Sequence, residues 1–378
     1  MKLMHLSDLH LGKRVNGFSM IQDQRFVLEQ ILEMAGEEAP DCALLCGDIY
    51  DKTVPSAEAV ELFDEFLSRL AALCPVYITS GNHDSAERLA FGGRLLEKAR
   101  VFVSPVYDGE VMTVEQEDDF GTVALHLLPF LKPVQVRRFY PDAPIESYTD
   151  ALRTALSGID LHDGRRHVLL AHQLVTGSER CESEELSIGG SDNVDAAVFE
   201  GFDYVALGHL HGPQRAGGDH IRYCGTMLKY SFSEAGHHKS VTFAQLGQKG
   251  SLEITTRPLR PLRDMKEIRG TYSELMARGF YQGTDLPECY LHITLTDEED
   301  VPEALSRLRT VYPHIMKLTY DNARTRLRQN PLELEAQPED SALDLFGLLY
   351  EKQNNRPLGT EQAAYLTELI ESIWEDGK

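Results

Sequence analysis

The sequence lacks any hydrophobic run long enough to cross a membrane, because no stretch approaches the roughly 20 apolar residues that a spanning helix needs. Its first residues, Met1 to Leu6, lack the longer apolar core of a secretory signal peptide. No two cysteines form a CxxC pair, and most stand beside apolar residues, where a thiol behaves as a small hydrophobic group. They are Cys42, Cys46, Cys74, Cys181, Cys224 and Cys289. We therefore expect a cytoplasmic protein with no membrane segment and no disulfide framework.

An excess of basic residues is also missing. The chain has 37 Lys and Arg against 60 Asp and Glu, which gives a formal net charge of −23. Proteins that bind nucleic acid without sequence preference gain affinity from Lys and Arg, which displace counterions from phosphates. If the substrate carries phosphates, binding here needs bound metal cations, a local basic patch or a partner subunit. Alternatively, the charge only keeps the protein soluble, and both explanations can hold together.

Strand and helix signals alternate along the first 260 residues. We expect helices at residues 22–37 and 56–73, the second with Ser56 as its N-cap. The apolar face predicted for the second helix carries Val60, Phe63, Leu67 and Leu70. Strands are expected at residues 3–6, 42–46, 76–79, 123–128, 167–171, 204–207, 221–224 and 241–246, and loops at 131–144 and 177–193. This alternation predicts a layered α/β fold in which central β-sheets are flanked by helices.

Two prolines within residues 257–261 interrupt any sheet ladder and mark a boundary. We expect a main domain at 1–260, a smaller α+β capping domain at 261–325, and a linker with a helical tail at 326–378. In the capping domain, helices are expected at 272–278 and after Pro302, and strands at 290–295 and 315–319.

The tail begins with an acidic linker at residues 330–340 and continues with amphipathic helices at 341–353 and 360–374. Two such helices bury little apolar surface by themselves, so they dock on the body of the protein or on a partner. The candidate partner-binding side chains are Leu343, Phe346, Leu349, Leu366, Leu369 and Ile373.

Side chains that bind metals follow five of the expected strands. Open α/β sheets place their functional sites at the carboxyl ends of strands, and glycines beside several of these residues allow sharp turns. The candidate metal ligands are Asp8, His10, Asp48, Asn82, His172, His209 and His211. A lone histidine of this kind is more often a hydrogen-bonded core residue than a ligand. Five such segments, each at a strand end, favour one shared site.

The spacing of the candidates also carries information. Asp8 and His10 stand two residues apart, so both point to one side of an extended segment, and the same holds for His209 and His211. The two oxygens of Asp48 are suited to bridging two ions. A mixture of oxygen and imidazole ligands suits Mn²⁺, Fe²⁺ or Zn²⁺ better than Mg²⁺ or Ca²⁺.

Several polar residues near these segments are candidates for other roles. His83 stands next to a ligand and is a candidate to protonate a leaving oxygen or hold a phosphate, with Asp84 as its orienting group. Arg88 and Lys229 are candidate DNA-binding residues, although a surface charge explains each equally well. We assign three further histidines to structure, namely His5, His126 and His167.

Taken together, the motifs resemble those of the calcineurin-like metallophosphoesterase superfamily: D-x-H, G-D-x-x-D, G-N-H-D, a single H, and G-H-x-H. Within it, the chain resembles bacterial nuclease subunits that work with an ATPase. That closer resemblance rests on residues 6–12, 172–177, 208–211 and 228–234 and on the 262–264 junction, and it extends over nearly the whole chain. One position departs from the pattern, since Met227 stands where proline is common.

The resemblance implies a two-metal phosphodiesterase that prefers manganese, although other divalent ions fit. It implies one ion at Asp8, His10, Asp48 and His211, a second at Asp48, Asn82, His172 and His209, and His83 as the catalytic histidine. It further implies a nucleoid-associated homodimer within a heterotetramer, whose tail helices bind near the root of the ATPase coiled coil. The expected activity is double-strand exonuclease and single-strand or hairpin endonuclease cleavage of DNA.

Two other functions compete with this interpretation. A small-molecule phosphodiesterase or phosphatase would share the metal centre, but a small substrate needs neither a capping domain nor tail helices. A non-catalytic scaffold that binds DNA ends or the ATPase is disfavoured by the complete set of ligands.

Overall fold

The computed structural model describes residues 1–184, 192–325, 343, 346–347, 350 and 357–375. The chain divides into two compact units, Met1–Asp264 and Met265–Lys378. Among the described residues, none belongs to a helix with the length and apolar character that a bilayer crossing requires.

The first unit contains a six-stranded sheet with the order β16-β15-β1-β4-β5-β6. Its strands are β1 (Lys2–Leu6), β4 (Cys42–Cys46), β5 (Val76–Thr79), β6 (Val101–Val103), β15 (Ser240–Leu246) and β16 (Leu252–Pro258). Strands β1, β4, β5 and β6 run parallel, whereas β15 is antiparallel to β1. Strand β4 is buried along its whole length, as its continuous apolar run predicted.

A second six-stranded sheet has the order β13-β14-β12-β9-β8-β7. Its strands are β7 (Met112–Asp118), β8 (Gly121–Leu127), β9 (Arg166–His172), β12 (Tyr204–Gly208), β13 (Gln214–Arg215) and β14 (Ile221–Tyr223). The central strands β8, β9, β12 and β14 are parallel, and a hairpin adds β7 at one edge. Two short strand pairs lie outside the sheets, β2 (Arg14–Val15) with β3 (Phe18–Ser19) and β10 (Leu174–Val175) with β11 (Asn193–Val194).

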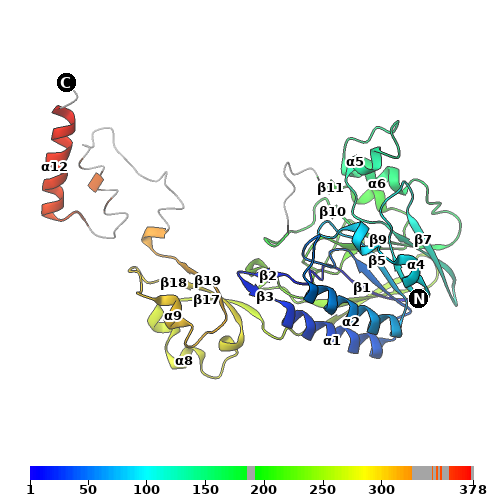
Figure 1. Ribbon diagram of the computed structural model, residues 1–378, viewed down its shortest axis with the longest axis horizontal. Helices are drawn as coiled ribbons and strands as arrows, with labels where there is room; N and C mark the ends of the chain where they lie inside the picture. Colours follow the sequence, from blue (N-terminus) through cyan, green and yellow to red (C-terminus); the bar gives the residue numbers. More distant parts are fainter. Residues whose placement is uncertain (185–191, 326–342, 344–345, 348–349, 351–356, 376–378) are drawn as a thin grey trace. The chain divides into compact units, whose positions relative to one another are not determined.

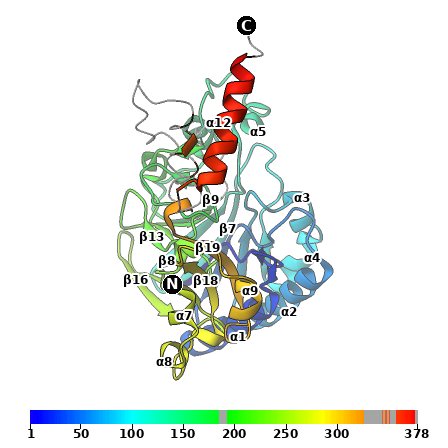
Figure 2. The same ribbon diagram turned by 90° about the vertical axis from the view of Figure 1, so that its left-hand side faces the viewer.

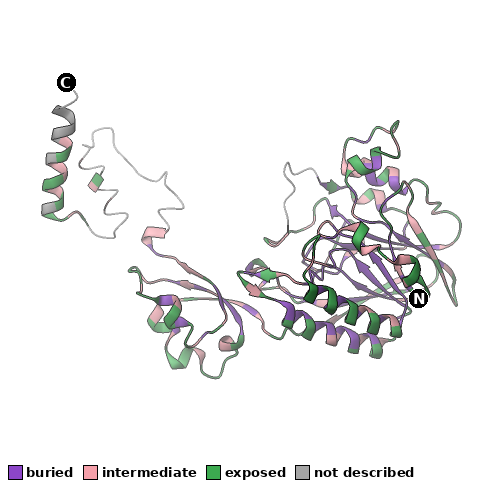
Figure 3. Cartoon of the chain, in the orientation of Figure 1, coloured by how far each residue is buried: buried purple, intermediate pink, exposed green. Residues whose placement is uncertain are grey.

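The two sheets stack face to face around a shared apolar core, which Leu44 enters from the first sheet and Leu170 from the second. The neighbouring Leu169 points to the opposite face, where it joins a second core with Leu152 of α6 (Tyr148–Leu156). This alternation follows from the two-residue period of a β-strand. Figure 3 shows the buried residues concentrated in the strands. The predicted layered α/β fold is therefore confirmed.

Helices α1 (Ile21–Glu38) and α2 (Ala57–Leu73) lie side by side along the first sheet (Figure 1). Ser56 caps α2 as predicted, because its hydroxyl accepts a 3.3 Å hydrogen bond from the backbone N–H of Ala59. The predicted buried face is rotated, however: Val60 is 43% exposed, whereas Ala59 is buried. The buried residues of α2 are Ala59, Leu62, Phe63, Phe66 and Leu70.

Several helices of this unit were not predicted from the sequence. Residues 131–144 were predicted as loop, but α5 (Pro133–Arg137) begins there, since proline in the first turn is compatible with a helix. Helix α6 starts at a capping box in which Ser147 and Asp150 exchange hydrogen bonds. Shorter elements of this unit are α3 (Ala86–Leu89), α4 (Gly93–Leu96) and the 3-10 helices η1 (Glu97–Ala99), η2 (Ala196–Phe199) and η3 (Phe232–Glu234).

The second unit begins with a three-stranded parallel sheet of order β17-β18-β19, formed by Met265–Gly270, Tyr290–Leu295 and Ile315–Tyr320. The other described elements are α7 (Tyr272–Leu275), α8 (Arg278–Tyr281), η4 (Leu286–Glu288), α9 (Ala304–Leu308) and α12 (Thr360–Glu375). Figures 1 and 2 show the short helices α8 and α9 beside this sheet. The single helix predicted at 272–278 is thus two short ones, whereas α12 matches the prediction at 360–374 within one residue.

Most of the predicted tail lies outside the described residues. This applies to the linker at 330–340 and to Leu349 within the predicted helix at 341–353. Leu343 and Phe346 are described and helical.

Candidate metal centre

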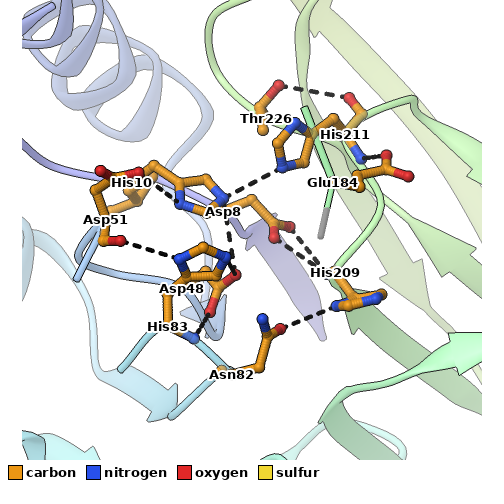
Figure 4. Close-up of polar contacts among 12 residues, drawn as sticks. Asp8, His10, Asp48, Asp51, Asn82, His83, Glu184, His209, His211 and Thr226 are labelled. Carbon is orange, nitrogen blue, oxygen red and sulfur yellow. Dashed lines mark hydrogen bonds and ion pairs between the residues drawn. The ribbon is translucent and has the colours of Figure 1, made fainter. Parts of the chain in front are cut away.

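The predicted ligands follow parallel strands whose carboxyl ends meet at one edge of the two sheets. Strands β1, β4 and β5 of the first sheet end before Asp8, Asp48 and Asn82. In the second sheet, β9 ends at His172 and its parallel neighbour β12 ends before His209. The structure brings all seven predicted ligands to this edge, and Figure 4 shows most of them facing a common space.

The loops that carry these residues are not extended. The backbone φ angles are 53° at Asp8, 44° at His10, 50° at Asp48 and 105° at His209, in the left-handed region that side chains other than glycine rarely adopt. The expectation that alternation in an extended segment directs Asp8 and His10 to one side is therefore wrong. Tight left-handed turns present both side chains instead, and such strained conformations concentrate at functional sites.

Asp48 is surrounded by imidazoles. Its Oδ2 lies 3.3 Å from Nε2 of His172, 3.7 Å from Nε2 of His10 and 3.9 Å from Nε2 of His83. Three groups of potential ligand atoms within 4.8 Å of one another overlap here. They are Asp8–His10–His211, His10–Asp48–His83 and Asp8–Asp48–His172.

Asn82 connects the remaining candidates. Its Oδ1 lies 3.0 Å from Nε2 of His172 and 3.0 Å from Nδ1 of His209. The backbone N–H of His209 donates to both carboxylate oxygens of Asp8 at 3.1 Å. Side chains from both sheets thus converge on one cluster.

The chemistry of this cluster fits a divalent cation. Burial raises the pKa of Asp8, and the negative charge of Asp48 adds to the increase although His172 opposes it. Burial also lowers the pKa of His172, but the carboxylate of Asp48 outweighs this effect and raises that pKa to about 9. Two buried carboxylates among imidazoles are the oxygen and nitrogen ligands that first-row divalent metals accept. The ligands present therefore fit divalent metal ions.

His83 lies closer to the ligands than the sequence indicated. Its backbone N–H donates to Oδ1 of Asp48 at 2.9 Å, and its Nδ1 lies 2.9 Å from the carbonyl oxygen of Asp51. Because a carbonyl oxygen only accepts hydrogen bonds, Nδ1 of His83 carries a proton. The other ring nitrogen, Nε2, then faces Asp48 and the candidate metal centre.

The structure does not support the proposed role of Asp84 as the group that orients His83. The carboxylate of Asp84 accepts backbone N–H groups from Ile49, Tyr50 and Gly81 at 2.9–3.1 Å. It joins the two loops that carry Asp48 and Asn82, so we assign it to positioning and not to catalysis. The carbonyl of Asp51 orients His83 instead.

Glycines allow these loops to approach closely. A Cβ atom on Gly81 would lie 2.1 Å from Oδ1 of Asp48, and one on Gly47 would lie 2.3 Å from Nδ1 of His172. Both distances are far below van der Waals contact. A larger residue at either position would displace a candidate ligand.

Sequence reasoning missed several residues that support the cluster. Gln24, buried on α1, donates to the carbonyl oxygen of His10 at 2.7 Å, and Tyr230 donates to the carbonyl oxygen of Leu9 at 2.7 Å. Glu184 accepts the backbone N–H of His211 at 2.7 Å. Asp51 was readable as the second aspartate of the G-D-x-x-D motif, whereas nothing in the sequence distinguishes Gln24 from a surface residue of the helix.

The two DNA-binding candidates lie in different surroundings. Arg88 is exposed on α3 and lines a groove beside Asn82. Lys229 is mostly buried, and its ammonium contacts Asp264 at 2.8 Å and the carbonyl oxygen of Ala235 at 2.7 Å. These contacts indicate a structural role for Lys229.

The histidines assigned to structure lie in the sheets. Nδ1 of His5 is 2.8 Å from the hydroxyl of Tyr204, and Nε2 of His126 is 3.0 Å from Nδ1 of His167. All three histidines are buried.

The chain is similar to two known protein families and to a characterised relative. Residues 1–213 match the calcineurin-like phosphoesterase family, and residues 261–354 match a family described as the type 5 capsule protein repressor C-terminal domain. Over 381 aligned residues, the chain is 29% identical to the SbcD subunit of the nuclease SbcCD from Staphylococcus epidermidis, with 99% of each chain covered.

Solved structures with similarity include a dimetal phosphatase from Danio rerio, at 12% identity and a TM-score of 0.41, which covers 68% of this chain and 96% of that one. GAP50, the anchor in the inner membrane complex of Plasmodium, is 10% identical with a TM-score of 0.42, and the match covers 84% of this chain and 96% of that one. The first family match spans more than half of the 378 residues. The chain therefore belongs to the calcineurin-like phosphoesterase family, as its motifs predicted, and is a metal-dependent phosphoester hydrolase.

Proposed function

We propose that the chain is the manganese-dependent DNA nuclease subunit of a complex with the ATPase SbcC, acting in DNA end processing during repair, recombination and replication. The activity is double-strand exonuclease and single-strand or hairpin endonuclease cleavage. The observation that carries the proposal is the set of three overlapping ligand groups around Asp8 and Asp48. A single ion needs about four ligands, whereas seven candidate ligands converge here.

In this proposal, the ligands divide into two sets that share Asp48. Asp8, His10, Asp48 and His211 hold one Mn²⁺ ion, and Asp48, Asn82, His172 and His209 hold the other. Two bound cations supply Lewis acidity and an activated water for phosphodiester hydrolysis.

The chain contributes charge balance and a proton donor. Asp8 and Asp48 bring only two negative charges, so the loaded site stays positive and attracts a phosphodiester despite the acidic chain. The carbonyl oxygen of Asp51 accepts from Nδ1 of His83, and Nε2 faces the centre. An imidazolium that carries a second proton on Nε2 would give this proton to the leaving oxygen or hold the phosphate.

A groove beside Asn82 offers a path for the DNA strand. Arg88 and Lys132 are exposed and line this groove together with Phe130. The ring of Phe130 lies 6.3 Å from that of His172, so the groove reaches the proposed ligands. Cations that follow a phosphate backbone beside an aromatic ring are typical of single-strand binding.

The relative from the nuclease SbcCD supports SbcC as the partner, because the alignment covers both chains almost completely. We assign nuclease activity to residues 1–260, DNA recognition to the capping domain at 261–325 and SbcC binding to 326–378. In the tail, Phe346 and Leu369 are each 41% exposed, as a docking face requires. Leu366 is half-buried, and the side chain of Ile373 lies outside the described part.

We further propose a homodimer within a heterotetramer. Phe91, between α3 and α4, and Leu95 of α4 are 86% and 71% exposed. Exposed large apolar side chains that lie close together are typical of protein–protein interfaces. They offer a surface for a second copy of the chain.

Incubation with linear duplex DNA and with a chromogenic phosphodiester in Mn²⁺ tests the proposal. We expect Mn²⁺-dependent cleavage of the DNA, abolished by a chelator. Turnover of the small ester alone would favour a small-molecule phosphodiesterase. Binding of DNA ends without turnover of either substrate would favour a scaffold.

A further inference from the structure

Hydrogen bonds hold His211 at its backbone N–H, its carbonyl oxygen and its ring nitrogen Nδ1. Its backbone N–H donates to Oε1 of Glu184 at 2.7 Å, and its carbonyl oxygen accepts from Nζ of Lys239 at 2.8 Å and from the backbone N–H of Thr226 at 3.2 Å. Its ring nitrogen Nδ1 lies 2.7 Å from the hydroxyl of Ser183. Figure 4 shows the contacts of the His211 backbone with Glu184 and with the hydroxyl of Thr226, and the imidazole directed toward His10.

The second partner of Ser183 determines where its proton lies. The Ser183 hydroxyl is 2.6 Å from Oε1 of Glu234, and a carboxylate only accepts hydrogen bonds. A hydroxyl has one proton, so Ser183 donates it to Glu234 and has only lone pairs left for His211. Nδ1 of His211 must therefore be the donor in the 2.7 Å contact.

Glu234 is itself fixed as an acceptor. It is fully buried, and its Oε2 lies 2.6 Å from Nζ of Lys239, which is also buried. Its Oε1 additionally accepts the backbone N–H of Tyr230 at 3.2 Å and the hydroxyl of Ser231 at 3.1 Å. A buried carboxylate paired with an ammonium keeps its charge, because either group alone would be strongly destabilised there.

We propose that Glu234, acting through Ser183, is a positioning residue that fixes the Nδ1–H tautomer of His211 so that Nε2 offers its lone pair to a cation. Nε2 of His211 lies 3.2 Å from Nε2 of His10, on the side of the candidate ligands. The inference rests on the proposed role of His211 as a metal ligand. Hydrogen bonds of this kind orient metal-binding histidines and tune their affinity.

In two other histidines of the site, a single backbone carbonyl fixes a proton on Nδ1. Nδ1 of His172 lies 2.9 Å from the carbonyl oxygen of Cys46, and Nδ1 of His83 lies 2.9 Å from that of Asp51. No such carbonyl contacts Nδ1 of His211 among the described residues. A chain of hydrogen bonds from His211 through Ser183 and Glu234 to Lys239 takes the place of the carbonyl contact.

The first test is ¹⁵N NMR of the metal-free full-length protein, which distinguishes protonated from bare ring nitrogens. We expect His211 of the wild type to carry its proton on Nδ1. Ser183→Ala should shift His211 toward a mixture of tautomers, and Ser183→Thr should restore the wild-type signal. The matched control is Ser231→Ala, which removes a hydroxyl from the same oxygen of Glu234 without touching His211. A wild-type ring with its proton on Nε2, or an unchanged tautomer in Ser183→Ala, overturns the proposal.

The second test is a Mn²⁺ titration followed by electron paramagnetic resonance. Ser183→Ala should lower the affinity for one of the two ions by about 10- to 100-fold, which is the usual effect of losing a hydrogen-bond partner of a metal-binding histidine. Ser231→Ala should have the affinity of the wild type. Equal affinities in Ser183→Ala and the wild type contradict the proposal. If wild-type protein has the expected tautomer but binds no Mn²⁺, the proposed function fails while the tautomer assignment stands. Glu234→Gln, checked for folding by circular dichroism, should reproduce Ser183→Ala.

Discussion

Oδ2 of Asp48 lies 3.3 Å from Nε2 of His172, and this contact joins the two sheets at the candidate metal centre. Asp48 follows β4 of the first sheet, and His172 ends β9 of the second. Both side chains are buried, and neither sheet alone provides the pair. The pair therefore makes the site depend on the packing of the two sheets against each other.

The pair predicts that metal binding releases a proton. Burial lowers the pKa of His172 but Asp48 raises it to about 9, so the imidazole of the metal-free protein is protonated at neutral pH. A cation binds only the neutral ring. Apparent Mn²⁺ affinity should therefore rise about tenfold per pH unit between roughly pH 7 and 8.5. Calorimetric titration in two buffers of different ionisation enthalpy measures the released protons.

The imidazoles of His209 and His10 add little to this pH dependence. Burial lowers the pKa of His209 to about 3 and holds that of His10 well below its usual range, so both are neutral before the metal binds. An affinity that does not change with pH would contradict the assigned state of His172.

The role of His83 predicts a separation of binding from catalysis. His83→Ala should retain both Mn²⁺ ions but lower the rate of DNA cleavage by about 10²- to 10⁴-fold, because proton transfer to the leaving oxygen is lost. Metal content and single-turnover cleavage are the measurements. His162→Ala, a substitution of an exposed histidine away from the site, is the control. Cleavage at the normal rate by His83→Ala would show that this histidine has no catalytic part.

The groove predicts where the DNA backbone runs. Arg88→Ala and Lys132→Ala should each weaken DNA binding and reduce the slope of log affinity against log salt by about 1, because each removes one phosphate contact. Hydrolysis of a chromogenic phosphodiester should be unchanged, since that substrate does not extend along the groove. Lys98→Ala, which removes an exposed cation outside the groove, serves as the control. If it matches the two groove variants, the effect is one of net charge and the groove assignment is wrong.

The tail predicts a partner-specific defect. A chain without residues 335–378 should keep Mn²⁺-dependent nuclease activity, because every proposed ligand lies in the first unit, and should lose SbcC binding. Co-purification with SbcC and nuclease assays on the isolated chain are the two measurements. Retained co-purification would assign the SbcC contact to another surface.

The fold was readable from the sequence because its signals are local. The apolar run Cys42–Cys46 and the Ser56 cap each depend on a few adjacent residues, and both are found in the structure. The buried face of α2 was misjudged at Val60, since the stripe of a helix is set by the sheet it packs on and not by hydrophobicity alone. Helix α5 escaped prediction because a proline in the first turn resembles a loop signal.

The candidate site was readable only in part. The candidate ligands carry recognisable side chains at strand ends, so their convergence was predictable. Their support was not: Ser183 and Glu234 lie 51 positions apart and meet only in the folded chain. Asp84 shows the opposite error, because its place beside His83 in the sequence indicated a partner, whereas its carboxylate binds backbone N–H groups of two loops.

An anomalous-scattering map of a crystal soaked in Mn²⁺ tests the central claim most directly. We predict two peaks about 3.5–4 Å apart, the separation typical of two-metal hydrolases. One peak should lie among Asp8, His10 and His211, the other among Asn82, His172 and His209, with Asp48 contacting both. A single peak, or peaks away from these side chains, would contradict the two-metal nuclease.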